Sequence, residues 1–268
     1  MQLNFNKDRF AVVGLGDTGL SIINYLRLQN ANIVRVYDTR ETPPNLDKIG
    51  DFKMHLGAMK YTDFDDVDVI VISPGVSIYE PALAEAMRQN KKVIGDIELF
   101  AQSIAKWKTK IIGITGSNGK TTVTSLTGHL CQSYGLNTLV AGNIGTPVLN
   151  SYIEIVKSGV FPDVIVLELS SFQLETLHSL KLNAATVLNI SEDHLDRYRD
   201  LLEYAYIKAN IFNNCGTQVL NYNDILVKAM LRPEQKAFWF GEGINAQQDV
   251  ANMFIVRDNN LVINGKQY

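Results

Sequence analysis

The sequence is poor in cysteine: Cys131 and Cys215 are the only two in 268 residues. A disulfide framework is therefore not indicated, and two thiols fit a reducing cytoplasm. No apolar run reaches the roughly 18 residues that a membrane-spanning helix needs. The first ten residues, MQLNFNKDRF, also lack the apolar stretch of a secretory signal. We therefore expect a cytoplasmic protein with no membrane partner.

The sequence also has no large surplus of charge of either sign. Its 25 basic and 28 acidic side chains leave a formal net charge of −3, which gives no electrostatic reason to expect a nucleic acid as a partner. There is no internal repeat and no low-complexity tract, and we expect a monomer. What is present is a globular composition, with 46% hydrophobic residues, and a length that suggests about two domains.

Short apolar segments that end in glycine or polar residues alternate with helical patterns. This alternation predicts an α/β fold with parallel, crossover-connected strands. It runs in two series, separated by an expected connecting helix at residues 97–109. We place the domain boundary between Gly95 and Lys110, and predict domains at residues 1–95 and 96–268.

The expected strands share an apolar body and a polar or glycine-bearing end. They are the segments 9–16, 33–40, 67–76, 91–96, 110–116, 137–143, 163–170, 184–191 and 217–223. An apolar pattern at residues 253–265 further predicts a β-hairpin that turns at residues 258–260.

The first glycine-rich loop has the spacing G-x-G-x-x-G at Gly14, Gly16 and Gly19. Glycines permit a tight strand-to-helix turn, and the N–H groups of the helix N-terminus can meet a phosphate. Asp38 ends the next strand, where an acid would bind a ribose, and Arg40 offers a second polar contact. The loop predicts a Rossmann-like parallel-sheet domain that binds a diphosphate-bearing ligand. A glycine turn that only packs helix on strand is the alternative.

The second glycine-rich loop, GITGSNGKTT, departs from a strict P-loop because Ile114 stands where glycine is required. The physical parts are nevertheless present. Backbone N–H groups can wrap phosphates, Lys120 can neutralise the β- and γ-phosphate oxygens, and the Thr121 hydroxyl can bind Mg²⁺. We predict a P-loop ATPase-type α/β domain that binds a nucleoside triphosphate at Gly116, Ser117, Asn118, Gly119, Lys120, Thr121 and Thr122.

Three further residues could complete the chemistry. Glu168 ends an apolar strand, where an acid either binds the metal ion of a P-loop or forms a salt bridge. His194 lies among carboxylates in a loop after another strand, which makes it a candidate ligand, although a lone loop histidine usually faces solvent. Lys208 falls near the middle of the apolar face of the helix at 201–212. Either its ammonium reaches water past a packed stem, or it is aimed at a site as a cation or a modified, anionic group.

Together these segments resemble the Mur ligase family. The resembling segments run in order through the chain as GLGDTGLS, DTR, SPG, GDIELF, GITGSNGKTT, GNIG, LELSSFQLE and LNISEDHLDRY, followed by the Lys208 helix. The similarity is strongest to members that add D-glutamate to UDP-N-acetylmuramoyl-L-alanine. It implies an ATP-dependent amide ligase of peptidoglycan precursor synthesis that uses ATP and two Mg²⁺ ions.

The resemblance changes the meaning of the first loop, which would bind the UDP part of the substrate rather than NAD. It implies substrate contacts by Thr18, Asp38, Thr39, Arg40, Gly75, Asn143 and His194. It implies one Mg²⁺ at Thr121 and Glu168, and a second at His194 and a carbamylated Lys208. The implied catalytic groups are Lys120, His194 and Lys208.

Two features depart from the family pattern. Asp17 is acidic beside the expected diphosphate, where related sequences often carry a neutral residue. Family members also have a C-terminal domain that binds D-glutamate. We expect this chain to hold only the first domain and most of the second, and so to bind the UDP substrate with little turnover. The alternative function is a non-catalytic fragment that binds a nucleotide or UDP-sugar. An NAD-dependent dehydrogenase leaves the Lys120 loop unexplained, and a folate-polyglutamate ligase would lack the first domain.

Overall fold

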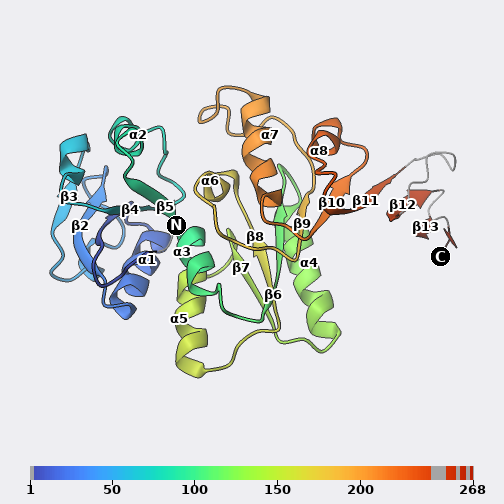
Figure 1. Ribbon diagram of the computed structural model, residues 1–268, viewed down its shortest axis with the longest axis horizontal. Coiled ribbons are helices and arrows are strands. Elements are labelled where there is room, and N and C mark those ends of the chain that lie inside the picture. Colours follow the sequence, from blue (N-terminus) through green and yellow to red (C-terminus); the bar gives the residue numbers. More distant parts are fainter. Residues whose placement is uncertain (1–2, 243–251, 258–259, 264–265, 268) are drawn as a thin grey trace. The chain divides into compact units, whose positions relative to one another are not determined.

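The computed structural model describes residues 3–242, 252–257, 260–263 and 266–267. It is an α/β protein, as predicted, and its two sheets belong to two compact units (Figure 1). In the described ranges no helix is both long and apolar enough to cross a lipid bilayer. The first unit comprises Met1–Trp107, Ile144–Phe161 and Glu175–Leu180, and the second comprises Lys108–Asn143, Pro162–Leu174 and Lys181–Tyr268.

The first unit is built on a five-stranded parallel sheet with the order β3-β2-β1-β4-β5. Two of the three inner strands, β1 and β4, are almost entirely buried, as expected when helices cover both faces of a parallel sheet. Four of the strands were predicted, whereas β3 is too short to give a pattern. The strands are β1 (Arg9–Val13), β2 (Asn32–Asp38), β3 (Met54–Leu56), β4 (Val69–Ile72) and β5 (Lys92–Gly95).

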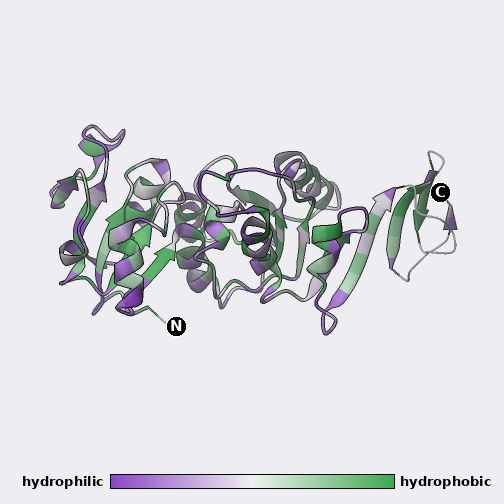
Figure 2. Cartoon of the chain, turned by 90° about the horizontal axis from the view of Figure 1, so that it is seen from above, coloured by the Kyte–Doolittle hydropathy of each residue, from purple (hydrophilic) through white to green (hydrophobic). Residues whose placement is uncertain are grey.

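Helices of the first unit pack on this sheet and on one another. α1 contacts β1, β2 and α5, and α3 also contacts α5. Figure 2 shows hydrophobic colouring on the central strands and hydrophilic colouring on many loops, in keeping with a buried cluster around Val13, Tyr37, Phe64 and Leu83. The helices are α1 (Asp17–Leu28), α2 (Pro81–Arg88), α3 (Asp96–Ser103) and α5 (Val148–Ser158), with short 3₁₀ turns η1 (Leu46–Lys48) and η2 (Tyr61–Phe64).

The second unit contains a nine-stranded sheet with the order β14-β13-β12-β11-β10-β9-β6-β8-β7. Strands β6 to β12 are mutually parallel where they pair, and β13 runs antiparallel to β12. This last pairing fits the predicted hairpin, whose first two turn residues lie outside the described residues. The strands are β6 (Lys110–Thr115), β7 (Thr138–Gly142), β8 (Val164–Glu168), β9 (Ala184–Val187), β10 (Thr217–Asn221), β11 (Lys236–Glu242), β12 (Met253–Arg257), β13 (Asn260–Ile263) and β14 (Lys266–Gln267).

One long helix covers the β6-β8-β7 end of the second sheet. α4 packs across β6, β7 and β8, and its Val123 contacts a buried cluster that includes Ile114, Val166 and Leu188. α7 contacts α6, and α8 contacts β10. The helices are α4 (Lys120–Ser133), α6 (Ser171–Leu174), α7 (Leu201–Ala209) and α8 (Ile225–Ala229), with the 3₁₀ turn η3 (Asn210–Phe212).

The tight packing of α1 on the first glycine turn gives a testable expectation. A Cβ atom added at Gly19 would lie 1.8 Å from the carbonyl oxygen of Gly14, whereas one added at Gly16 meets nothing within 4 Å. We expect Gly19→Ala to lower the free energy of unfolding by roughly 1–3 kcal/mol. Gly16→Ala should cost less than about 1 kcal/mol, through the weaker N-cap. Urea denaturation of both variants measures the difference, and equal losses would contradict the close-packing role of Gly19.

Candidate functional site

The predicted nucleotide-binding residues of the second unit lie at one edge of its sheet. The phosphate loop, defined as residues 116–122, follows β6, and Asn143 follows β7. Glu168 ends β8, and His194 lies in the loop after β9. These four strands are parallel neighbours, so their carboxyl ends meet at the same edge, where ligands bind in open α/β sheets.

The phosphate loop bends through two glycines with positive φ, Gly116 at 155° and Gly119 at 80°. Gly119 is the N-cap of α4 and supplies no side-chain cap, so the N–H groups of the first turn are left for another acceptor. The Lys120 ammonium donates to the carbonyl oxygens of Gly116 and Ser117, at 3.0 and 2.9 Å. An uncapped helix start beside a lysine suits an anion with several oxygens.

Glu168 is 1% exposed, and hydrogen bonds hold both of its carboxylate oxygens. The Thr121 hydroxyl donates to Oε2 at 2.8 Å, and the Asn143 amide donates to Oε1 at 2.9 Å. Within the described chain Glu168 forms no ion pair, so the predicted alternative of a salt-bridged strand end is not observed. A buried carboxylate beside a hydroxyl offers the oxygen ligands that Mg²⁺ prefers, and these two side chains fit such an ion.

The remaining ligands of such an ion would have to come from phosphate, water or other side chains. Over the residues that the structure describes, no group of three or more His, Cys, Asp or Glu side chains is placed to hold a metal ion. This agrees with the general use of Mg²⁺, which keeps several waters and binds through one or two carboxylates and substrate phosphates.

Lys208 on α7 is 1% exposed, so its ammonium does not reach water. Its Nζ donates to the Thr115 hydroxyl at 3.3 Å and lies 4.7 Å from the centre of the Tyr204 ring. Burial, and then the charge of Lys120, lower the pKa of Lys208 to about 7, while Asp193 opposes this shift. No described carboxylate forms an ion pair with it. This buried amine therefore has a substantial neutral fraction near pH 7.

His194 is one of the few non-glycine residues with a positive φ, at 54°. Its ring lies 4.7 Å from that of Phe172 and 6.4 Å from that of Tyr204, measured between ring centres. Its Nε2 is 3.5 Å from the Asp193 carboxylate. Tyr204 therefore contacts both predicted ligands of the second ion, although no hydrogen bond within the described chain joins His194 to Lys208 directly.

The predicted substrate residues of the first unit also converge. The glycine loop, defined as Gly14–Gly19, follows β1, while Asp38 ends β2 and Gly75 follows β4. Since β2 and β4 flank β1, the three carboxyl ends meet. The Ser73 hydroxyl donates to the carbonyl oxygen of Gly14 at 2.9 Å and joins two of these ends. Thr39 and Gly75 are exposed, and Thr18 is half-buried.

Asp38 is 3% exposed and organises the glycine loop. Its Oδ2 accepts from the N–H of Leu15 at 2.7 Å and from the Arg40 guanidinium at 2.7 Å. Its Oδ1 accepts from the N–H and Nε of Arg40. Burial raises the pKa of Asp38, but the hydrogen bonds from Arg40 and Leu15 outweigh it and hold the pKa at about 2. The carboxylate therefore stays ionised at neutral pH and fixes the loop.

The acidic residue at the start of α1 is held by a neutral amide. Asn45 is 2% exposed, and its Nδ2 donates to the Asp17 carboxylate at 3.3 Å. The Lys48 ammonium donates to the other end of the same amide at 2.9 Å. Gly16, the N-cap of α1, supplies no side-chain cap. Asp17 thus has its own partner, and the first N–H groups of α1 remain open to an anion.

Two asparagines that organise these loops were not predicted to do so. Asn45 lies in a long segment between β2 and β3 that gives no sequence signal. Asn189 falls at the polar end of the expected strand at residues 184–191 and was given no role, yet its side chain bonds to the phosphate loop. A polar amide two residues after a buried strand is the one signal that could have marked Asn189.

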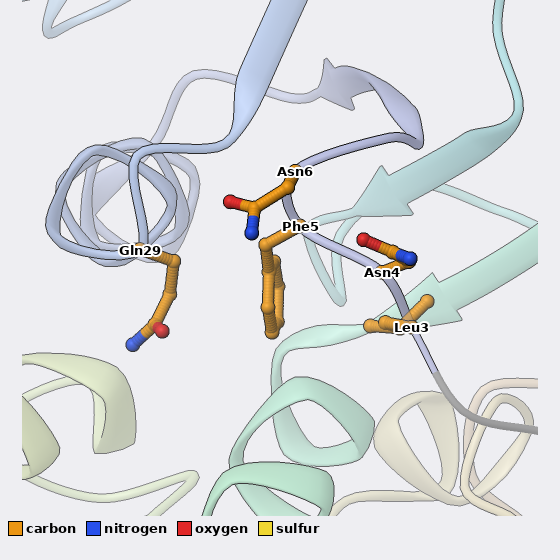
Figure 3. A pocket seen from close by; sticks show the side chains of 5 residues that line it. All are labelled: Leu3, Asn4, Phe5, Asn6 and Gln29. Carbon is orange, nitrogen blue, oxygen red and sulfur yellow. The ribbon is translucent and has the colours of Figure 1, made fainter.

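An open hollow in the first unit lies away from the glycine loop of that unit. Its lining residues are Leu3, Asn4, Phe5, Asn6 and Gln29 (Figure 3). Gln29 is the C-cap of α1, whereas the glycine loop precedes the first turn of that helix. The 12 residues of α1 separate the two by roughly 18 Å. The hollow is therefore not part of the predicted diphosphate site at the glycine loop.

Two family models match the chain. Residues 8–95 match the family described as Mur ligase MurD-like, N-terminal domain. Residues 114–263 match the Mur ligase middle domain, which by itself spans more than half of the 268 residues. The first match contains the glycine loop, Asp38 and Arg40. The second match contains the phosphate loop, Glu168, His194 and Lys208.

Curated relatives with the name UDP-N-acetylmuramoylalanine–D-glutamate ligase match most of the chain. The relative from Chromobacterium violaceum is 47% identical over 253 residues, which cover 93% of this chain and 55% of the relative. That from Haemophilus influenzae (strain PittEE) is 43% identical over 267 residues, which cover 98% of this chain and 56% of the relative. The chain thus spans about half the length of these relatives.

Solved structures show the same fold at much lower identity. UDP-N-acetylmuramate:L-alanyl-gamma-D-glutamyl-meso-diaminopimelate ligase from Neisseria meningitides has a TM-score of 0.58 at 15% identity, covering 97% of this chain and 85% of that one. UDP-N-acetylmuramate-alanine ligase from Thermotoga maritima has a TM-score of 0.52 at 18% identity, covering 97% of this chain and 59% of that one. With two domain models matched in order and the fold in agreement, the chain belongs to the Mur ligase family.

Proposed function

We propose that the protein is an ATP-dependent amide ligase that adds D-glutamate to UDP-N-acetylmuramoyl-L-alanine in peptidoglycan precursor synthesis. The name shared by relatives at 43–47% identity supports the substrates. The observation that carries the chemistry is the hydrogen bond from the exposed Thr121 to the buried Glu168, beside the Lys120 loop. The two free cysteines of the described chain fit a cytoplasmic location.

The proposed reaction has two steps. The L-alanine carboxylate of the UDP substrate attacks the γ-phosphorus of ATP, which forms an acyl phosphate and releases ADP. The D-glutamate amine then attacks the acyl carbon, phosphate leaves, and the amine loses a proton to solvent. Both steps bring anions together, and two like charges at about 4 Å repel by about 4 kcal/mol at an effective dielectric constant near 20.

The chain's own residues are arranged to offset this repulsion. The Lys120 ammonium needs only to exchange two carbonyl oxygens of the loop for phosphate oxygens. The open N–H groups at the start of α4 bind the same phosphates. Positioning and charge neutralisation then provide most of the catalysis, as in other phosphoryl transfers.

Two cation sites complete the proposal. Mg²⁺, when bound, supplies further positive charge to the reacting oxygens. We assign Thr121 and Glu168 to the first site, with the Asn143 amide holding the carboxylate in place. We assign His194 and a carbamylated Lys208 to the second site. What supports the second assignment is the contact of both side chains with the Tyr204 ring.

The environment of Lys208 supports the proposed carbamylation. The neutral amine attacks the carbon of CO₂, an N–C bond forms, one C=O electron pair moves to oxygen, and a proton leaves nitrogen. The product is an anion on a side chain that would otherwise be a buried cation. The pKa of about 7 and the lack of a carboxylate partner in the described chain both favour this reaction.

The first domain, which we place at residues 1–95, binds the UDP part of the substrate, while ATP binds in residues 96–268. The family match at residues 8–95 and the uncapped start of α1 support this assignment. Thr18, Thr39, Arg40 and Gly75 are the proposed contacts, and Asp38 orders the loop through Leu15 and Arg40. His194 and Asn143 are the proposed contacts to the muramoyl end.

The function is tested by phosphate release from the full-length protein. With ATP, Mg²⁺ and UDP-N-acetylmuramoyl-L-alanine present, we expect release to depend on D-glutamate and not on L-glutamate. Removal of Mg²⁺ with a chelator should abolish it. Binding of the UDP substrate without any D-glutamate-dependent release would instead support a binding protein without catalysis, and would contradict the proposal.

Glu168→Gln tests the first cation site. The amide keeps the size of the side chain but removes the negative charge that a cation needs. We expect kcat to fall by roughly 10–100-fold or more, and the Mg²⁺ concentration for half-maximal rate to rise. Affinity for the UDP substrate should stay within about twofold. An unchanged Mg²⁺ requirement in this variant would exclude Glu168 as a ligand.

Lys208→Met tests the buried amine through the pH dependence of stability. The folded pKa of about 7 lies below the value of about 10.4 for an unfolded lysine, so the unfolded state binds the proton more tightly. The native amine therefore costs nothing above about pH 10.4, and its cost grows as pH falls towards 7. We expect Lys208→Met to raise the thermal midpoint more at pH 6.5 than at pH 9.5, in bicarbonate-free buffer. A pH-independent difference would show that Lys208 is not a buried, perturbed amine.

A further inference from the structure

The phosphate loop is bonded to the loop that follows β9. The carbonyl oxygen of Asn189 accepts from the N–H of Ser117 at 2.9 Å. The Asn189 side chain forms a two-bond fork with Asn118, accepting from its N–H at 2.8 Å and donating to its carbonyl oxygen at 3.0 Å. One asparagine thus satisfies two N–H groups and one carbonyl group of the phosphate loop.

Side chains of both loops extend this contact. The N–H of Ser191 donates to the Ser117 hydroxyl oxygen at 2.9 Å, and the Asn118 amide donates to the Ser191 hydroxyl at 3.1 Å. The Ser117 hydroxyl also donates to the carbonyl oxygen of Ser191 at 3.1 Å and lies 3.4 Å from the Tyr204 hydroxyl. The segment from Ser117 to Asn118 is therefore held along its whole length.

The close approach of the two loops depends on a glycine. A Cβ atom added at Gly116 would lie 3.0 Å from Cβ of Leu188, 3.3 Å from its N, and 3.4 Å from N of Asn189. Any larger residue would push the phosphate loop away from the end of β9. Gly116 thus permits the hydrogen bonds that Asn189 makes.

The loop after β9 also forms hydrogen bonds with the end of β10 and with the N-cap residue of α8. The Asn221 amide donates to the carbonyl oxygen of Leu188 at 2.8 Å. Asp224 accepts from the N–H of Ile190 at 2.7 Å, while its other oxygen caps α8. The backbone on both sides of Asn189 is therefore fixed, and Asn189 in turn fixes the conformation of the phosphate loop.

We infer that Asn189 is a positioning residue that turns the N–H groups of Ser117 and Asn118 away from the nucleotide. Phosphate contacts then begin at Gly119 and continue into the first turn of α4, whose N–H groups have no partner within the helix. This inference deepens the proposed function and rests on it for the identity of the ligand, a nucleoside triphosphate. It differs from the sequence prediction, which gave Ser117 and Asn118 a direct part in binding.

Asn189→Ala removes the fork and leaves the main-chain bond to Ser117. The loss of two hydrogen bonds of ordinary strength should lower the equilibrium constant that favours this loop conformation by roughly 10–100-fold. We expect the Kd of ATP, measured by calorimetry with the full-length protein, to rise about tenfold. Affinity for the UDP substrate should not change, since that ligand is assigned to the first domain.

The matched control is Asn183→Ala. The Asn183 side chain also accepts a main-chain hydrogen bond, from the N–H of Ile111 at 2.9 Å, but at the opposite end of β6. We expect a lower thermal midpoint in this variant with no change in the Kd of ATP. A similar loss of ATP affinity in both variants would show that general destabilisation is the cause, and would overturn the inference.

A measurement without nucleotide separates this inference from the proposed function. In Asn189→Ala the amide of Asn118 should exchange with deuterium at least tenfold faster than in the unmodified protein, while Asn183→Ala leaves its rate unchanged. Equal exchange rates in Asn189→Ala and the unmodified protein overturn the inference even if ATP binds. Faster exchange in Asn189→Ala, together with no ATP binding by the unmodified protein, would confirm that Asn189 holds the phosphate loop and would overturn the proposed function.

Discussion

A parallel strand can be followed by its neighbour only after the chain has crossed back over the sheet, and the whole arrangement depends on this constraint. Each crossing returns a new loop to the same edge. The phosphate loop, Asn143, Glu168 and His194 are far apart in sequence, yet four neighbouring strands deliver them together. The first sheet does the same for the glycine loop, Asp38 and Gly75. A candidate site can therefore form from single residues that lie at the ends of different strands.

Burying ionisable side chains is an energetic cost of the candidate site in the second unit. Glu168 and Lys208 are each 1% exposed, and within the described chain neither forms an ion pair. The carboxylate is supported by neutral donors from Thr121 and Asn143, whereas the amine donates to the Thr115 hydroxyl and lies over the Tyr204 ring. An uncompensated buried charge is costly, so such groups are usually neutralised or matched by an ion. Binding of a cation beside Glu168, or conversion of Lys208 to an anion as proposed above, would offset this cost.

The spacing of residues along the sequence predicted much of the fold and of the candidate site. Both glycine-rich loops and the position of Glu168 at a strand end follow from a strand–turn–helix pattern within about 20 residues. β3 was missed because three residues of mixed polarity carry no period. The fork between Asn189 and Asn118 joins residues 71 positions apart and depends on sheet register, which no local pattern encodes. The helical wheel placed Lys208 on an apolar face but could not say what covers it, and the structure shows complete burial.

The absence of a side-chain cap on both α1 and α4 has a thermodynamic consequence. In the described part of the chain no side chain caps the start of either helix, so a phosphate bound there would act as the missing cap. A ligand that binds only the folded state raises the free energy of unfolding with the logarithm of its concentration. For a ligand that binds at either helix start, helix order and ligand occupancy would be coupled, and the stability measured for that unit would depend on the ligand concentration.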